Sequence, residues 1–491
     1  MRKYTLAGLL VFTLSLLVSA TAVVAIALDR GNGAEPDSLH PHKAQGLNSH
    51  HILHDIYEGL LTYDKQGQPV LGVAERYTVS EDGLQWDFRL KKNARWSDGS
   101  EVVAGDFIRA WQQAIKPTTA APYGFLFANM RNQQQLQVSS RDKHQLQIKL
   151  QSPDLRLPDK LVLPVFAPLP AAGKSVFNGA YQLQRHQPHE YVKLQKNTFF
   201  HAADSVHFET IRYLVTENQN SELLRFRAGE LAITETVPDA QLDWLRMHLA
   251  DALRIAPYNG SFFLGLNLTD KQLTDLNLRK ALNFAINRTI LVEKVLKSGQ
   301  QPAAGLLPDE SNKKDLFDLE KAQQYLALSG FNIKRDRLEI LYNNSDNQKK
   351  VALAVAAMWW QNLGIKSRLK NQEWKVFIET RKGPNKQLFR GGWIADYEDS
   401  LNYLQLFESQ SHFNYYGFND PRYDALLKRL RAQVLTVHER AALSSQADAI
   451  LQQQLPMIPL YFYVSRHLVN PGLKGYINNF SDKHLSRYLY Q

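Results

Sequence analysis

The sequence predicts an α/β chain that folds into more than one domain. Short strand-like runs alternate with amphipathic helical segments along its whole length. At 491 residues the chain is too long for one compact core. Its composition, 44% hydrophobic and 22% charged, is that of a globular protein and excludes the disordered and fibrous classes.

The N-terminus has the pattern of an export signal. Arg2 and Lys3 supply positive charge, and the run from Leu6 to Leu28 contains no charged residue. Small residues follow the leucine-rich part, so we predict a signal peptide over residues 1–25 and an exported mature chain. The same run is long enough to span a bilayer, so an uncleaved N-terminal anchor is the alternative.

Cysteine and charge usage exclude several classes of function. The chain has no cysteine, which rules out disulfides, thiolate catalysis and cysteine–zinc sites. The formal net charge is +10, but basic residues are dispersed among acids and no run of five Lys or Arg occurs. We therefore expect a solvated basic surface and no nucleic-acid partner.

The first half of the chain predicts strands around one helix. Residues 25–31 ("AIALDRG") indicate a strand, which a His-rich helical segment follows, and "LQWDFRL" (84–90) and "HQLQIKL" (144–150) indicate two more. Between them, "AGDFIRAWQQAI" (104–115) places Phe107, Ala110, Trp111 and Ile115 at helical spacing. The proline-rich "LVLPVFAPLPAAG" (161–173) suits a linker or an extended crossover.

The second half predicts longer helices. One helix is expected over 275–299, with Leu278, Leu282 and Ile290 on one face and Gly299 as C-cap. A second covers 349–363 and ends at Gly364, and a strand follows over 366–372. Residues 457–471 return to strand-like composition, so we expect the C-terminal part of the chain to pack with the N-terminal strand region.

Catalytic motifs are not found. The sequence has no nucleophile elbow, no P-loop and no dinucleotide fingerprint, and "HERAA" from His438 lacks the second histidine of a zincin helix. We expect no enzyme activity and no cofactor, with an enzyme acting on exported peptides kept as the less favoured hypothesis.

A metal-binding alternative rests on one His-rich segment. If Ser49 caps a helix there, His50 and His54 fall at i,i+4 on one face and form a ligand pair. No further ligand completes the set of a metal site. No residue is therefore assigned to a metal, and the alternative is a metal or metal-chelate receptor. The histidines of the segment are His40, His42, His50, His51 and His54.

Several long motifs follow one another along the chain. The first two are "NSHHILHDIYEGLLTYDKQGQPVLGVAERY" (48–77) and "WDFRLKKNARWSDGSEVVAGDFIRAWQQAIKP" (86–117). The next are "FNGAYQL" (177–183), "LNLRKALNFAINR" (276–288) and "GGWIADY" (391–397). In this order they resemble the bacterial extracellular solute-binding proteins of peptide ABC importers, the oligopeptide-binding and murein-peptide-binding family. The likeness covers nearly the whole chain from residue 26.

The resemblance implies a type II periplasmic binding fold, in which two α/β lobes close around a hinge and a small extra domain is added. It further implies a monomer that binds a short peptide, murein peptides being one candidate class, and delivers it to an inner-membrane ABC permease. The implied parts are lobe I in three pieces (26–57, 170–259 and 465–491), the extra domain (58–169) and lobe II (260–464).

The resemblance also implies binding residues at matching positions. Asp396, in the "ADY" motif, would pair with the peptide ammonium, because a desolvated ammonium needs a close anion. Arg390 and Arg381 would bind the peptide carboxylate, and Gln348 stands where the family has a third basic group. The remaining expected contacts are Trp393 as a wall of the pocket, the family tyrosines Tyr123 and Tyr463, Tyr258 at the crossover between the lobes, and Gly46, Gly391 and Gly392 as places for backbone pairing.

Overall fold

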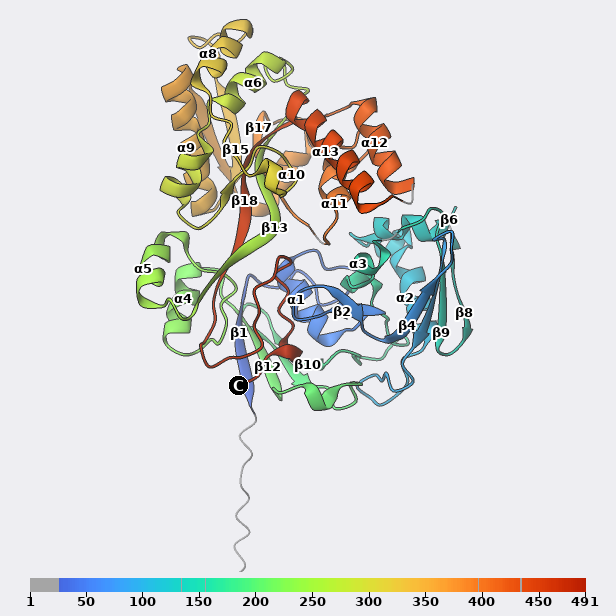
Figure 1. Cartoon of the computed structure of the whole chain (residues 1–491). Coiled ribbons are helices and arrows are strands. Elements are labelled where there is room, and N and C mark those ends of the chain that lie inside the picture. Colours follow the sequence, from blue (N-terminus) through green and yellow to red (C-terminus); the bar gives the residue numbers. More distant parts are fainter. Residues whose placement is uncertain (1–25, 134, 155, 396, 433–434) are drawn as a thin grey trace, which may run out of the picture.

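Two lobes and a third, smaller unit make up the structure. The computed structural model describes residues 26–491 except 134, 155, 396, 433 and 434 (Figure 1). The predicted signal peptide, 1–25, lies outside this range. Among the described residues, no helix is both long and apolar enough to cross a membrane.

Lobe II is built on a six-stranded mixed sheet that is buried on both faces. Phe262 and Leu264 point into one core, and Phe263, which lies between them in the strand, points into the other. Trp359 packs in the first core and donates its indole N–H to the carbonyl of Leu282 at 2.9 Å. In sheet order the strands are β14 (Gln301–Pro302), β18 (Met457–Leu468), β13 (Leu253–Leu266), β17 (Leu388–Ile394), β15 (Leu338–Asn343) and β16 (Ser367–Gln372).

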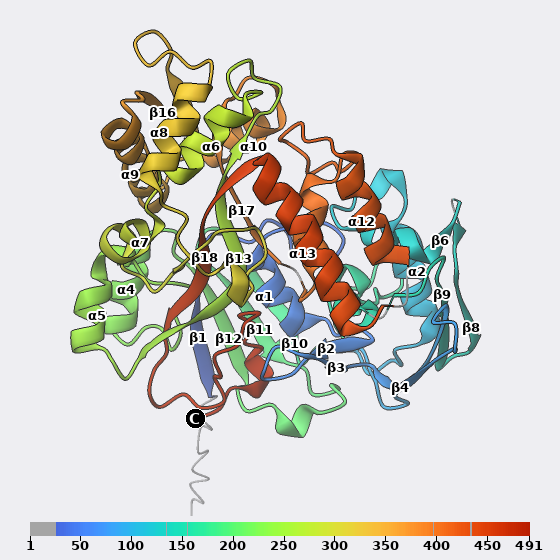
Figure 2. The ribbon, with the colours of Figure 1, turned by 45° about the horizontal axis from the view of Figure 1, so that its top comes forward.

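Helices cover both faces of this sheet, as Figure 2 shows. The first core is packed by α6 (Leu276–Phe284), α8 (Leu319–Leu328) and α9 (Asp346–Leu363). The second core is packed by α10 (Trp374–Lys382), α11 (Ser400–Leu404), α12 (Pro421–Ala432) and α13 (Val437–Gln454).

Lobe I contains a four-stranded sheet and the C-terminal segment. Its strands are β1 (Ala27–Gly33), β12 (Thr210–Val215), β11 (Tyr191–Lys196) and β10 (Tyr181–Gln187), with α1 (Leu47–Ile56) packed against them. Val469, Leu473 and Leu489 lie in the same core as Leu28, and the Arg30 guanidinium donates to the His484 carbonyl at 2.9 Å. The C-terminal segment thus packs on the first strand of the chain. The numbered boundaries of the lobes stay a prediction.

Two smaller helices complete lobe I. They are α4 (Gln219–Arg227) and α5 (Leu242–His248), which share a core with Leu468 at the end of β18.

The third unit is an antiparallel sheet covered by α2 (Ala104–Ala114). Phe107 and Trp111 are fully buried on that helix, as the periodicity predicts. The strands in order are β4 (Ala74–Val79), β5 (Gln85–Leu90), β9 (Gln145–Lys149) and β8 (Val138–Asp142). Short hairpins add β2 (Leu61–Tyr63), β3 (Pro69–Leu71), β6 (Arg131–Asn132) and β7 (Gln135–Leu136).

The linker predicted over 161–173 is wrong for its first half. The short helix α3 (Leu157–Leu161) and a 3-10 turn (Pro164–Phe166) are buried in the core of the third unit. The Trp111 indole donates to the Phe166 carbonyl at 2.9 Å, which fixes the turn beneath α2. Pro164 therefore begins a buried turn.

The helix predicted over 275–299 is also wrong in extent. It ends at Phe284, and the chain restarts as α7 (Arg288–Ile290), where the Asn287 side chain accepts the Ile290 N–H. Ile290 is 47% exposed, so it does not lie on a buried helix face. The helical turn that follows α7 ends at Lys297, with a φ of 57°, and not at Gly299. By contrast, α9 ends at Gly364 with a φ of 70°, as predicted.

Only β13 and β18 run side by side from lobe I into lobe II among the described residues (Figures 1 and 2). Pro257 pairs with Val464, and the next pair is Ser261 with Phe462. Three residues of β13, Tyr258 to Gly260, therefore lie opposite Tyr463 alone. A bulge of this kind bends the strand and interrupts the ladder, so it marks the hinge between the lobes.

A buried ion pair joins three distant segments at the base of the structure. The Arg487 guanidinium contacts Glu58 Oε1 at 2.5 Å, and His201 Nε2 lies 2.6 Å from Glu58 Oε2. Burial alone would raise the pKa of Glu58, but the His201 hydrogen bond and the Arg487 charge outweigh it and lower that pKa to about 2. Glu58 thus stabilises the fold above the unfolded-state pKa of about 4.3, and this contribution is lost as pH falls toward 2.

Glu58→Gln is expected to lower the free energy of unfolding at pH 7 by about 1–3 kcal/mol, because it leaves Arg487 buried without a charge partner. Denaturant titrations at pH 7 and pH 3 measure this, and the difference between wild type and variant should shrink at the lower pH. Glu310→Gln, whose side chain is 89% exposed, is the control and should change nothing. Equal stabilities of Glu58→Gln and wild type at pH 7 would contradict the assigned role.

Candidate functional site

Strand β17 carries four of the predicted residues next to the hinge bulge. It pairs with β13, so that Gly392 lies opposite Phe262 and Trp393 opposite Ser261. Because side chains alternate along a strand, Arg390 and Gly392 share one face, and Gly391 and Trp393 share the other. The predicted residues of this strand are therefore divided between two faces.

The first face brings Arg390, Gly392 and Tyr463 together. Arg390 Nη2 lies 3.4 Å from Tyr463 Oη, and its guanidinium carbon is 5.6 Å from the Phe262 ring centroid. A Cβ added to Gly392 would lie 2.7 Å from Tyr463 Oη. The missing side chain of Gly392 therefore leaves room for the tyrosine hydroxyl to lie across the strand.

The second face packs into the lobe II core. A Cβ on Gly391 would lie 2.4 Å from the Phe263 ring, so this glycine has a packing reason of its own. The Trp393 indole donates to Asn402 Oδ1 at 2.6 Å, and its ring is edge-on to Phe413 at 5.1 Å. Roles of Gly391 and Trp393 in ligand binding stay predictions.

Arg381, on α10, is a partly buried cation over aromatic rings. Its guanidinium carbon lies 5.2 Å from the Tyr415 centroid and 5.8 Å from that of Phe377. Burial lowers the pKa of Arg381, and the nearby positive charge of Arg390 lowers it further. Tyr415 and Tyr416 act in the opposite direction and raise this pKa. Within the described part of the chain, no carboxylate pairs with Arg381, and its Nε is buried without a hydrogen bond. Such a cation favours an anionic ligand.

Asp396 lies outside the described residues, although both of its neighbours are described. Ala395 N–H donates to the Asn259 carbonyl at 2.8 Å, and the Asn259 side chain accepts the Tyr403 hydroxyl at 2.6 Å. Asn259 belongs to the hinge bulge, so the chain before Asp396 is held by the hinge. The predicted role of Asp396 stays a prediction.

The other predicted residues lie on different elements. Tyr123 faces lobe I, with its ring 5.7 Å from His50, and Tyr258 is in the hinge bulge. Gly46 is the N-cap of α1 and donates its N–H to Asp37 Oδ1 at 3.1 Å. Gln348 is in the first turn of α9 with a buried, unbonded Oε1, and no described contact joins it to either arginine.

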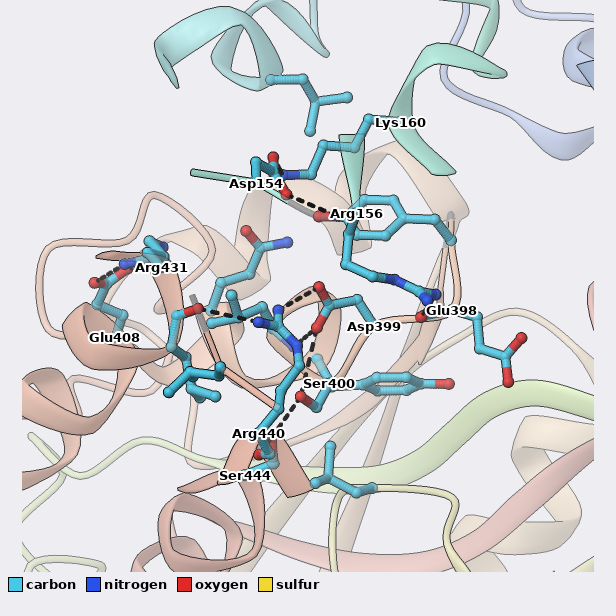
Figure 3. A pocket seen from close by; sticks show the side chains of 18 of the residues that line it. Asp154, Arg156, Lys160, Glu398, Asp399, Ser400, Glu408, Arg431, Arg440 and Ser444 are labelled. Carbon is cyan, nitrogen blue, oxygen red and sulfur yellow. Dashed lines mark hydrogen bonds and ion pairs between the residues drawn. The ribbon is translucent and has the colours of Figure 1, made fainter. Parts of the chain in front are cut away.

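A cavity of about 1020 Å³ lies between the third unit and helices α11 to α13 (Figure 3). Its charged lining is largely paired: Lys160 with Asp154 at 2.6 Å, Arg440 with Asp399 at 2.6 Å, and Arg431 with Glu408 at 2.5 Å. None of the described residues predicted for binding lines it, but Asn259 and Tyr397 do. Sequence reasoning missed this cavity because its walls come from segments that are about 250 residues apart in the chain.

Contacts at the edge of this cavity hold the third unit against lobe II. Tyr397 is 9% exposed and packs in the core of the third unit. Arg156 pairs with Asp159 at 3.1 Å and also donates to the Glu398 carbonyl. Burial raises the pKa of Asp159 to about 6, Arg156 opposes the rise, and Asp399 and Glu398 add to it. These contacts form only when the third unit lies against lobe II.

Arg156→Ala is expected to weaken ligand binding two- to tenfold, about 0.5–1.5 kcal/mol, because a contact of the closed form is lost. Stopped-flow measurement should place the change in the dissociation rate. Arg109→Ala is a matched control, since Arg109 also pairs with an aspartate three residues away, at 2.5 Å, on the third unit. If Arg156→Ala and Arg109→Ala behaved alike, Arg156 would not stabilise closure.

The family sequence model described as "Bacterial extracellular solute-binding proteins, family 5 Middle" matches residues 68–415. The chain belongs to this family. Its members are solute-binding receptors, so the expectation of no enzyme activity agrees with the family. The two-lobe type II fold expected from the sequence is confirmed by the solved structures of the same family.

Relatives of similar length differ in the ligand that they are named for. The periplasmic murein peptide-binding protein MppA of Escherichia coli is 32% identical over an alignment of 492 positions that covers 93% of this chain and 91% of MppA. The probable deoxycholate-binding periplasmic protein YgiS of the same organism is 30% identical over an alignment of 496 positions that covers 94% of this chain and 92% of YgiS.

Solved structures indicate the closure state. The structure of E. coli MppA superposes with a TM-score of 0.87 at 32% identity over 95% of this chain and 98% of that one. Haemophilus influenzae OppA in complex with the peptide RPPGFSPFR gives 0.84 at 29% identity over 95% and 99%. An unliganded open form of MppA gives only 0.76, at 31% identity over 95% and 97%. The lobes of this chain are thus arranged less like the open form.

The metal-receptor alternative is not supported. Helix α1 begins after Gly46, so Ser49 is not its cap, and the rings of His50 and His54 meet edge to face at 6.5 Å with other aromatic rings around them. His50 faces Tyr123, and His54 lies 5.3 Å from the Tyr63 ring. Burial lowers the pKa of His50 to about 4. Over the described ranges, no third ligand group joins these two histidines in a metal-sized cluster.

Proposed function

We propose that the chain is the periplasmic receptor of an ABC importer and binds short peptides between its two lobes. The observation that carries the proposal is Arg381, a partly buried cation beside Arg390 that pairs with no carboxylate of the described chain. A peptide carboxylate fits this position, since a planar guanidinium binds a carboxylate through two parallel hydrogen bonds. Membership of the solute-binding family and the likeness to a peptide complex support the same conclusion.

The hinge supplies the mechanism of capture. A ligand that contacts both lobes stabilises the closed arrangement, in which Tyr397 and Arg156 make their contacts with the other part. We expect the closed form of a monomeric receptor to engage an inner-membrane permease and to deliver the peptide to it.

A bile-acid ligand is the second candidate, because one relative is named as probably deoxycholate-binding and a bile acid also carries a carboxylate. The two candidates differ at the other end of the ligand. A peptide has an ammonium for Asp396, whereas deoxycholate has none. Recognition of a free amino terminus therefore separates them.

Mass spectrometry of small molecules released on unfolding the natively purified protein tests the proposal. Short peptides at near-stoichiometric level are expected, and murein peptides would be recognised by their D-amino acids and diaminopimelate. Release of a bile acid, or of no peptide from protein that also fails to bind peptides after refolding, would contradict the proposal.

A further inference from the structure

Two histidines and an aspartate meet where the C-terminal segment crosses β18. His467 Nε2 lies 3.0 and 3.1 Å from the two carboxylate oxygens of Asp482, and His484 Nε2 lies 3.0 Å from Asp482 Oδ1. The three ligand atoms all fall within 4.8 Å of one another. The side chains are 9%, 12% and 7% exposed, so this is no surface cluster.

The orientation of the His467 ring is fixed from behind. Its Nδ1 lies 3.0 Å from the carbonyl oxygen of Thr234, which can only accept a hydrogen bond. Nδ1 therefore carries a proton, and the other nitrogen, Nε2, is directed at Asp482. A ligand histidine that donates its second N–H to a backbone carbonyl is the usual outer-shell arrangement of metal sites.

The spacing of the three donors fits a transition metal. Ligands at about 2.0–2.2 Å in a tetrahedral shell stand about 3.3 Å from one another. The nitrogen–oxygen separations of 3.0–3.1 Å are close to this value. Two imidazoles and one carboxylate are three of the four ligands of such a shell, and they leave one position for water or another side chain.

A second acid lies beside the cluster. Glu235 acts electrostatically on both His467 and Asp482, is 25% exposed, and has His51 Nε2 at 3.9 Å. Arg30 and Lys483 are the cations nearby. The Asp482 carboxylate, which both imidazoles already contact, would supply negative charge to a bound divalent ion.

We propose that His467 Nε2, His484 Nε2 and the Asp482 carboxylate bind a divalent transition-metal ion of the zinc type. The site is distinct from the His-rich segment at 40–54 and independent of peptide binding. Because His467 is on β18 and the other two ligands are on the C-terminal segment, the ion would fasten that segment to the hinge strand at its lobe I end. The competing possibility is a plain histidine–aspartate ion pair.

Equilibrium dialysis of the untagged, chelator-treated mature protein against Zn²⁺, with metal analysis, tests the proposal. One tightly held ion per chain is expected. Asp482→Asn and His484→Gln should each weaken binding about 100-fold or more, since loss of a ligand costs at least as much as loss of an outer-shell partner. His186→Gln is the matched control, because His186 also contacts a carboxylate, Glu35 at 2.7 Å, and in the described part of the chain no second imidazole ring contacts that carboxylate.

Co²⁺ absorption of the wild type gives a readout that needs no variant. The intense visible bands of a four-coordinate nitrogen–oxygen site support the proposal. Absence of a stoichiometric ion in the wild type would overturn it in favour of the ion pair. So would retention of the ion by folded Asp482→Asn and His484→Gln, or equal loss in His186→Gln.

Discussion

Asp396→Ala is expected to weaken peptide binding by about 3–5 kcal/mol, a factor of about 100 to 4000. The reason is that the ligand ammonium loses its water when the lobes close, and only a nearby anion compensates for that loss. Calorimetry with a tripeptide measures the change. Glu398→Gln is the matched control, because Glu398 is exposed two residues away and should leave affinity unchanged.

An acetylated peptide separates a direct contact from an indirect one. If Asp396 binds the ammonium, N-acetylation should cost affinity in the wild type and almost nothing in Asp396→Ala. An equal cost of acetylation in both proteins would show that another group reads the amino terminus.

Arg381→Ala is expected to weaken binding of a peptide with a free carboxylate by about 2–5 kcal/mol. Arg381 pairs with no described carboxylate of its own chain, so its removal leaves the ligand anion without a charge partner. A C-terminally amidated peptide should bind wild type and Arg381→Ala with similar affinity. Peptides of two to five residues should be compared, because Arg390 is the expected partner of the carboxylate in peptides of a different length.

Arg422→Ala serves as the control for Arg381. The Arg422 side chain is 66% exposed and pairs with Asp420 at 2.6 Å, and Arg422 is not among the predicted binding residues. If amidation cost the same affinity in wild type and Arg381→Ala at every peptide length, Arg381 would not bind the carboxylate.

Local patterns in the sequence predict much of the fold. Helix α2 and helix α9 follow from apolar spacing, and Gly364 ends α9 because glycine adopts the left-handed conformation without strain. The long strand β18 follows from its β-branched and aromatic composition. These signals are short in range, so they are readable without a structure.

Long-range contacts could not be read in this way. Helix α6 ends early because fully buried Arg288 donates to the carbonyls of Asn283 and Ile286, which a continuous helix would have used. The buried turn at 164–166 depends on Trp111, more than 50 residues away. Apolar spacing contains no information on either contact.

The site residues, too, could be predicted only in part. Resemblance to the family pointed to Arg390, Gly392 and Tyr463, which the structure brings together. The cavity beside Tyr397 was missed because its walls come from distant segments. The cluster of His467, Asp482 and His484 was missed because the last two residues follow His467, on β18, by 15 and 17 residues, which is no recognisable local motif.

Calorimetry with one tripeptide in free and doubly blocked form tests the central claim most directly. If the receptor holds a peptide by both of its termini between two lobes, the free tripeptide binds and the N-acetylated, C-amidated form does not. Equal affinity for both forms, or binding of deoxycholate with none of the tripeptide, would contradict the account.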